Sequence, residues 1–299
     1  MANLKIINTP KLLENYTSPP VPSPIKSNGN IVQTGNIQEF LTTKQGHKIN
    51  KNAYNNKRVR KSKITQIFLH HTAGWPKDDK GASVIRTFNQ RVFGGKGSTH
   101  CVIDKNGIIE RCVPEDRIAY AQGNNNKFGL SVELMALGKV TKSGNKFIAY
   151  DQDIAPYGVT GARAVKFDGT TEYTFRNNEY YQAYTGQQCV ATVNLIEEWC
   201  YRYNIKFVFD QKAYDLMFPP LGQAPIKGKS TPGVFSHCSV RPNGKSDIYP
   251  DKTLINLFKN KFGKNDITNP TVSSFNSSVL TPKDLPDWNP TEMVKGNTS

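Results

Sequence analysis

Apolar and polar positions alternate in short blocks through the middle of the chain. Apolar runs of strand length occur at residues 64–69, 99–104, 108–113, 130–134 and 234–237. Segments whose apolar positions recur at helical spacing occur at residues 83–89, 178–203 and 251–262. Strands that alternate with helices predict an α/β domain, in which helices flank a mixed central β-sheet.

A hairpin is predicted where two of these strands meet. Asn106-Gly107 lies between the runs 99–104 and 108–113 and is typical of a two-residue type I′ turn. That turn would set Cys101 directly opposite Cys112, at a separation that allows a disulfide. We nevertheless expect free thiols there.

The segment 178–203 has the clearest helical pattern. Its apolar stripe consists of Cys189, Val193, Ile196, Cys200 and Tyr203. Both cysteines are therefore expected to fill the core rather than to bind metal. The segments 136–176 and 211–233 contain many loop-forming residues and are predicted as loops, the first as an insertion over the domain.

Both ends of the chain differ from the middle in composition. Residues 1–60 contain the polyproline-like PPVPSP and many turn formers, and residues 265–299 are polar and punctuated by proline. Neither end carries enough apolar surface to fold alone. The sequence therefore predicts a domain at 61–264 between extended N- and C-terminal arms, and we expect these arms to order against a partner.

Charge gathers at the amino-terminal end. The whole chain has a net charge of +15, and residues 1–63 hold eleven Lys or Arg residues against Glu14 and Glu39. Such a surface favours anionic partners, which include nucleic acid, anionic lipid and cell-wall polymers, or else serves solubility alone. The chain shows no apolar run of the ~20 residues that a membrane span needs. Its first residues lack the apolar core of a signal peptide.

Two histidines and a carboxylate follow strand-like runs. His70 ends the run in IFLHHTAG at 67–74, and His237 and Asp247 frame HCSVRPNGKSD at 237–247. Three such ligands suit a catalytic zinc ion, because the fourth tetrahedral position stays open for water. Residue alternation along a strand places His71 and Cys238 on the opposite faces, so His71 is expected to pack and Cys238 is the weaker alternative to Asp247.

IFLHHTAG, SVEL at 131–134 and HCSVRPNGKSD together resemble the zinc-dependent N-acetylmuramoyl-L-alanine amidases. These are the type 2 amidases of bacteria and phages, which are similar in fold to peptidoglycan recognition proteins. The resemblance covers residues 61–264 and implies Zn²⁺ bound by His70, His237 and Asp247. It also implies that Glu133 is the general base and that Lys245 stabilises the oxyanion. Because its strand neighbours are apolar, Glu133 is also expected to have a raised pKa.

The sequence departs from the family pattern at two places. Thr99 precedes His100 where many relatives carry a tyrosine near the metal, so either Thr99 or Glu133 takes that role. Tyr120-Ala121-Gln122-Gly123 stands where relatives have Trp-His-Ala-Gly. These departures concern contacts with the substrate and leave the zinc ligands intact.

The resemblance implies a peptidoglycan hydrolase that cleaves between N-acetylmuramic acid and L-alanine. Without a signal peptide, such a protein is expected in a phage virion or in the host cytoplasm before release to the wall, as a phage lysin. The terminal arms would then bind other virion proteins. The alternatives are an inactive peptidoglycan-binding module and a structural virion protein with an amidase-like fold.

Overall fold

A computed structural model describes residues 59–73, 97–149, 152–153, 159–161, 163–165, 172–177 and 180–263. The predicted helix at 83–89 and nearly all of both terminal arms lie outside these residues. Within the described part of the chain, no helix is long and apolar enough to cross a membrane.

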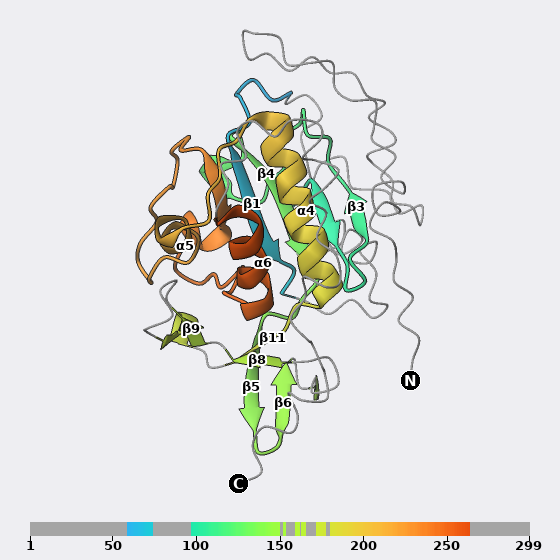
Figure 1. The fold of residues 1–299 in the computed structure, drawn as a ribbon, viewed down its shortest axis with the longest axis vertical. Coiled ribbons are helices and arrows are strands. Elements are labelled where there is room, and N and C mark those ends of the chain that lie inside the picture. Colours follow the sequence, from blue (N-terminus) through green and yellow to red (C-terminus); the bar gives the residue numbers. More distant parts are fainter. Residues whose placement is uncertain are drawn as a thin grey trace.

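A five-stranded mixed sheet forms the centre of the domain, as predicted (Figure 1). Its strands, in spatial order, are β12 (Gly233–Ser236), β1 (Gln66–His71), β4 (Gly129–Leu134), β2 (Cys101–Ile103) and β3 (Ile109–Arg111). The first four run parallel to their neighbours, and β3 is antiparallel to β2. Every residue of β1 is buried, because this strand lies between β12 and β4 with both faces covered.

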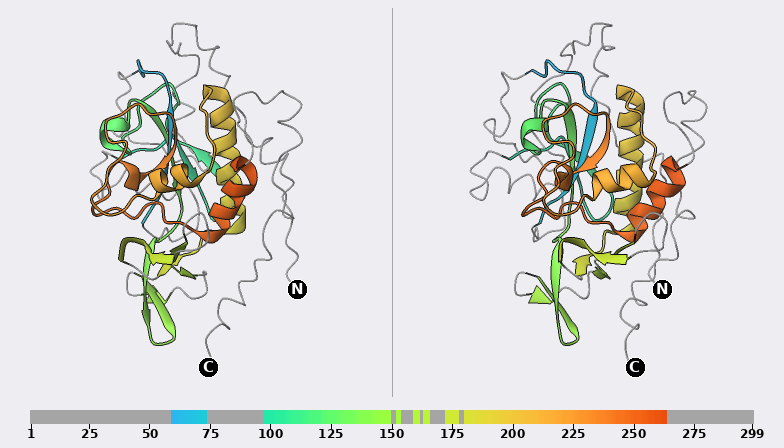
Figure 2. Two further views of the ribbon diagram at one scale, coloured as in Figure 1. Left: turned by 60° about the vertical axis from the view of Figure 1, so that its left-hand side comes forward. Right: turned by 90° about the vertical axis from the view of Figure 1, so that its left-hand side faces the viewer.

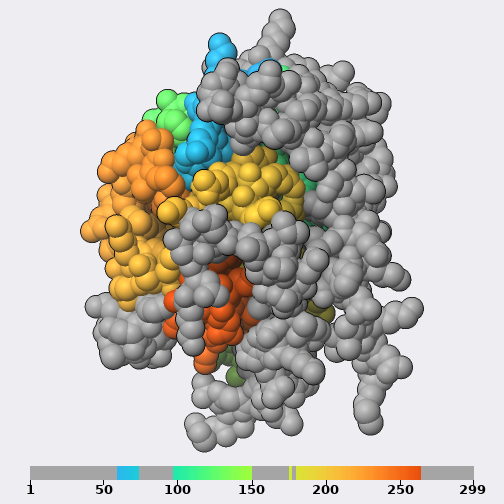
Figure 3. Space-filling view, turned by 45° about the horizontal axis from the view of Figure 1, so that its top comes forward, coloured from blue at the N-terminus to red at the C-terminus, as the bar shows by residue number. Residues whose placement is uncertain are grey.

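Helices α4 (Gly186–Tyr203) and α6 (Lys252–Phe262) cover one face of the sheet (Figure 2). The predicted stripe of α4 is buried, and both helices also reach the surface shown in Figure 3. Thr185 caps the first turn of α4, so the helix begins later than the predicted 178. The expected loop at 211–233 is wrong at its start, because Asp210 caps a further helix, α5 (Gln211–Met217).

The hairpin between β2 and β3 differs from the prediction. Its loop has three residues, and only Gly107 among them has a positive φ, of 76°. Asp104 Oδ1 accepts hydrogen bonds from the backbone N–H groups of Asn106 and Ile108, which fixes this longer turn. The register therefore pairs Cys101 with Arg111 rather than with Cys112, and all five cysteines are free thiols, as expected for that pair.

The insertion predicted as loop-like contains strands, so that prediction is wrong. The described residues of 136–176 include β5 (Lys139–Ser143), β6 (Lys146–Ala149), β7 (Gln152–Asp153), β8 (Val159–Gly161), β9 (Arg163–Val165) and β10 (Glu172–Thr174). A further strand, β11 (Tyr180–Gln182), lies in the segment that was predicted as the start of the helix 178–203. Five of these strands form a second sheet in the order β7-β6-β5-β11-β8, and β9 pairs with β10. This part projects from the lower end of the domain in Figure 1.

Tyrosine stacking joins the insertion to the main core. Tyr249 lies between Tyr181 and Tyr184, with ring centroids 4.5 Å from each. Its hydroxyl donates a hydrogen bond to the Gln182 carbonyl, and the Gln182 side chain accepts one from the Leu137 N–H. The base of the insertion therefore packs against the segment that follows Asp247. Short 3₁₀ turns, η3 (Gly123–Asn125), η5 (Phe175–Asn177) and η6 (His237–Ser239), complete the fold.

Candidate metal centre

His70 and His237 meet because their strands are adjacent and parallel. Leu69 of β1 pairs in register with Ser236 of β12, and the residue that follows each of them is a histidine. Their Nδ1 atoms lie 3.1 Å apart, and both side chains are buried. His237 lies in η6 rather than at the end of the predicted strand, because the Ser236 hydroxyl caps this turn.

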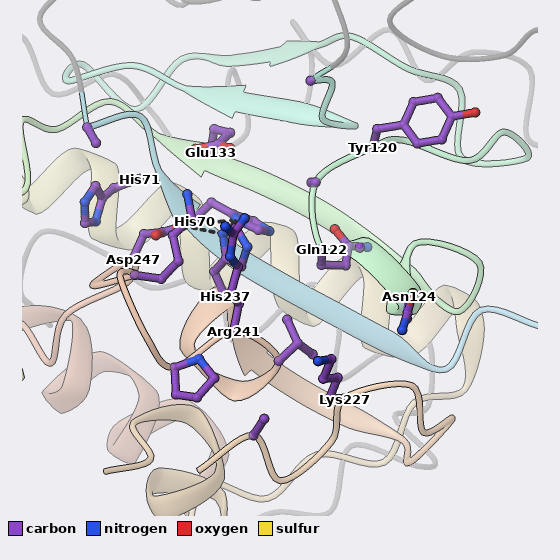
Figure 4. Close-up of a pocket in the computed structure, with 18 of the residues that line it drawn as sticks. His70, His71, Tyr120, Gln122, Asn124, Glu133, Lys227, His237, Arg241 and Asp247 are labelled. Atoms are coloured by element: carbon purple, nitrogen blue, oxygen red, sulfur yellow. Dashed lines mark hydrogen bonds and ion pairs between the residues drawn. The ribbon is translucent and has the colours of Figure 1, made fainter. Parts of the chain in front are cut away.

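Asp247 completes the cluster from the loop that follows η6. Its Oδ2 lies 2.8 Å from His237 Nδ1 and 3.2 Å from His70 Nδ1 (Figure 4). The Cys238 N–H donates to the Asp247 carbonyl, which ties the loop back to η6. Burial alone would raise the pKa of Asp247, but the two histidines outweigh it and hold this pKa well below its ordinary value.

The three side chains fit a zinc ion. Their candidate ligand atoms all lie within 4.8 Å of one another. Zinc ligands at tetrahedral angles and usual bond lengths are separated by about 3.3 Å, close to the distances found here. Two histidine nitrogens and a carboxylate oxygen facing one point need a cation or a proton between them, which favours a metal site.

The remaining candidates, Cys238 and His71, lie outside this cluster. Cys238 Sγ is directed to the carbonyls of Lys245 and Asp247, and burial raises the pKa of its thiol to about 12. Cys238 points away from the cluster because it lies in the 3₁₀ turn η6. The prediction that it faces away from the metal is met, but the reason given for it, alternation along a strand, is wrong. The His71 ring packs on Tyr249 at 5.4 Å, and burial lowers its pKa to about 4.

Glycine is required beside His71. Gly138 has φ of +78°, and a Cβ atom there would lie 2.4 Å from His71 Nε2. A larger residue would therefore push the ring of His71, and with it the end of β1 that carries His70.

Glu133 lies beside the cluster on the neighbouring strand. It pairs in register with His70 across β1 and β4, and its Oε2 is buried without a hydrogen-bond partner. Burial, with a smaller contribution from Asp247, raises the pKa of Glu133 to about 7, although His70 and Lys245 act in the opposite direction. This carboxylate can therefore exchange a proton near neutral pH.

Lys245 and Thr99 occupy different positions relative to the cluster. Lys245 lines the same pocket as His70, His237 and Asp247. Thr99 is buried, and its hydroxyl donates to carbonyls of Ser131 and Cys101. Thr99 is not among the residues that line the pocket, which leaves Glu133 as the candidate for the second catalytic role.

The cluster opens into a pocket of about 960 Å³. Sequence reasoning missed several of its polar lining residues: Asn124, Lys227 and Arg241. Arg241 lies inside the motif HCSVRPNGKSD, so its position four residues after His237 was a usable signal. Lys227 and Asn124 had none, because they come from loops whose approach to the metal end depends on the whole fold.

Together, the fold and the site define an α/β protein with an open His-His-Asp centre beside a half-buried glutamate. The chain belongs to the N-acetylmuramoyl-L-alanine amidase family, whose model matches residues 60–248. The match includes His70, Glu133, His237 and Asp247. The chain is thus an amidase of the type 2 class.

Solved structures show a more distant likeness. One is the Ph2119 endolysin from the Thermus scotoductus MAT2119 bacteriophage Ph2119, with 17% identity, a TM-score of 0.36, and coverage of 72% of this chain and 93% of that chain. Another is the selenomethionine derivative of AmpD, with 18% identity, a TM-score of 0.33, and coverage of 64% and 83%. No curated protein matches the sequence.

Proposed function

We propose that this protein is a zinc-dependent hydrolase that cleaves the amide between the lactyl group of N-acetylmuramic acid and L-alanine. His70, His237 and Asp247 would hold the metal. The observation that carries this proposal is the convergence of the three ligand atoms within 4.8 Å beside Glu133 in an open pocket. The family match supports the amide as the bond that is cleaved.

Glu133 moves the protons in this reaction. A bound zinc ion supplies Lewis-acid polarisation of the carbonyl and lowers the pKa of the attacking water. Glu133 takes a proton as the water oxygen bonds to the carbonyl carbon, and it delivers that proton to the amine nitrogen as the C–N bond breaks. A pKa of about 7 suits both halves of this exchange.

Lys245 stabilises the negative charge that develops on the carbonyl oxygen. It lines the pocket two residues before Asp247, and its charge acts on Glu133, which supports a position of its ammonium group near the metal end. A fixed cation at this point acts on the transition state more strongly than on the uncharged substrate.

In its biological setting, the protein would act as a phage lysin on the bacterial wall. The basic amino-terminal segment supports docking to an anionic or virion-associated partner, since residues 1–63 carry much of the net charge. The complete ligand set favours an enzyme over an inactive peptidoglycan-binding module or a structural virion protein, because neither of these needs a metal site.

The first prediction tests the metal and the bond together. Purified protein should contain one zinc ion and should release peptides with a new L-alanine amino terminus from peptidoglycan. His237→Ala should lose both the zinc and the activity, whereas Cys238→Ala should retain both. Elemental analysis and amino-terminal labelling of the products measure these outcomes. Full activity of His237→Ala in the presence of a chelator would refute the proposed centre.

A further inference from the structure

The wall of the pocket beyond the metal carries unpaired positive charge. Lys227 and Arg241 both line the pocket, both are exposed, and neither side chain has an ion-pair partner among the described residues. The acidic side chains that line the same pocket are Glu133 and Asp247, and both lie at the metal end. The rest of the pocket is therefore positively charged.

Backbone hydrogen bonds hold the segments that carry both cations. The Arg241 N–H donates to the His237 carbonyl at 2.9 Å, so Arg241 follows the metal ligand by one turn. The turn that carries Lys227 is tied to the same segment, because the Ile226 N–H donates to the Ser239 carbonyl. Ile226 itself is buried. The backbone that carries Lys227 and Arg241 is thus part of a fixed pocket wall, from which the two side chains extend.

The opposite wall is polar and uncharged. Tyr120, Gln122 and Asn124 come from the segment before β4 and face Lys227 and Arg241 across β1 in Figure 4. Asn125 joins the walls, since its side chain donates to the Ile226 carbonyl and accepts from the Gly228 N–H. A ligand in this pocket therefore meets cations on one side and neutral groups on the other.

We propose that Lys227 and Arg241 form a subsite for a free carboxylate of the stem peptide. This inference rests on the proposed amidase function and names the part of the substrate that the pocket selects. A carboxylate on the second or third residue of an extended peptide lies about 7–10 Å from the cleaved amide. Arginine can bind such a group through two parallel hydrogen bonds, and lysine adds a second charge.

The second prediction uses matched soluble muramyl peptides. One carries free carboxylates, and two others carry a carboxamide in place of the carboxylate at the second or the third residue. The wild-type protein should prefer the fully acidic peptide over one of the amidated forms by about 10–100-fold in kcat/KM, mostly through KM. The amidated peptide whose kcat/KM is lower than that of the acidic peptide identifies which carboxylate is bound.

Variants of the two cations test the assignment directly. Arg241→Gln and Lys227→Gln should each lower kcat/KM for the acidic peptide and should change it much less for the sensitive carboxamide. Lys206→Gln, an exposed lysine outside the pocket, is the matched control and should behave as wild type. Zinc content and melting temperature should be the same in all variants.

Two outcomes would overturn the subsite. One is a wild-type protein that cleaves acidic and amidated peptides equally well. The other is a pair of variants that lose the same factor on every peptide, since a charge-specific contact cannot act equally on a neutral amide. If the wild-type protein cleaved none of the peptides while binding zinc, the proposed amidase reaction would fail, which is a separate result.

Discussion

Two buried polar clusters lie at opposite ends of β4, and they differ in how their hydrogen bonds are satisfied. Glu133 lies near the carboxyl end of the strand, beside the candidate metal cluster of His70, His237 and Asp247. Gly129 begins the strand, and its carbonyl accepts a hydrogen bond from the guanidinium of Arg60. Along a strand these positions are about 13 Å apart.

The Arg60 cluster is closed. Arg60 is 1% exposed, and its five N–H groups donate to five backbone carbonyls. The acceptors are the carbonyl oxygens of Glu115, Arg117, Asn126, Lys127 and Gly129. Burial lowers the pKa of Arg60 to about 10, although nearby Tyr203, Glu115 and Asp116 act to raise it. The guanidinium is therefore held as a fixed structural bridge.

The metal cluster is open. Glu133 Oε2 and His70 Nε2 are buried without hydrogen-bond partners, and both residues line the pocket. An unpaired buried polar atom costs free energy that the folded state recovers only when a ligand or substrate supplies the partner. The comparison teaches that polar burial alone does not mark a functional site. Polar burial with unsatisfied atoms at a pocket does.

The largest expected effect breaks the open cluster at its proton acceptor. Glu133→Gln keeps the shape of the side chain and removes the base, so turnover should fall by about 10²–10⁴-fold with zinc retained. Burial raises the pKa of Glu133 to about 7, so at pH 8 the folded wild-type protein bears the cost of a buried negative charge. The neutral amide of glutamine avoids this cost, and the metal-free variant should therefore unfold at a higher temperature than the metal-free wild type at pH 8. Steady-state kinetics and calorimetry measure the two effects, and near-normal turnover would assign the base elsewhere.

A smaller effect is expected from breaking the closed cluster. Arg60→Met keeps much of the apolar stem and removes five hydrogen bonds to backbone carbonyls, which should cost about 3–5 kcal/mol of stability. Zinc content and kcat per folded molecule should stay unchanged. Lys61→Met, at the exposed next residue, is the control. A loss of kcat without a loss of stability would contradict the structural role.

The same arginine sharpens the boundary of the domain. The sequence placed residue 60 in the amino-terminal arm, yet Arg60 is buried and Val59 forms a bridge with Arg117. A chain that begins at Lys61 would lack the five hydrogen bonds of Arg60. Any excised amidase domain should therefore begin at or before Val59.

Arg60 also shows where sequence reasoning stops. The basic run KRVRKSK at 57–63 reads as a solvated charged segment, and nothing in it distinguishes the one arginine that enters the core. By contrast, the ends of parallel neighbouring strands meet in space, so His70 and His237 could be brought together from motifs alone. Asp247 followed because the motif fixes its distance from His237.

The insertion was missed for a related reason. Its strands are short and contain polar residues at most positions, as in the KVTKS of β5, so no apolar alternation marks them. They gain stability from pairing with each other and from the tyrosine stack around Tyr249, both of which are tertiary effects. The predicted length of the turn at Gly107 was wrong for a similar reason. Asn-Gly is compatible with two loop lengths, and hydrogen bonds to the Asp104 side chain stabilise the longer one.

The smallest predicted effect concerns pH and the neutral histidine of the closed cluster. The Ser131 N–H donates to His100 Nδ1, so the proton lies on Nε2, which donates to the Arg117 carbonyl. Burial lowers the pKa of His100 to about 3, and the adjacent Arg60 contributes in the same direction. Below pH 6.5 the unfolded chain therefore takes up a proton that the folded chain does not. Stability from this residue is complete above pH 6.5 and is lost as the pH falls, by about 1.4 kcal/mol per unit.

His100→Gln should be less stable than wild type at pH 7 and should show a shallower decline between pH 6.5 and pH 4. Denaturant unfolding in the presence of a chelator measures this decline. His71 also has a lowered pKa, but it contributes equally to both proteins. Parallel declines would show that His100 is charged in the folded state.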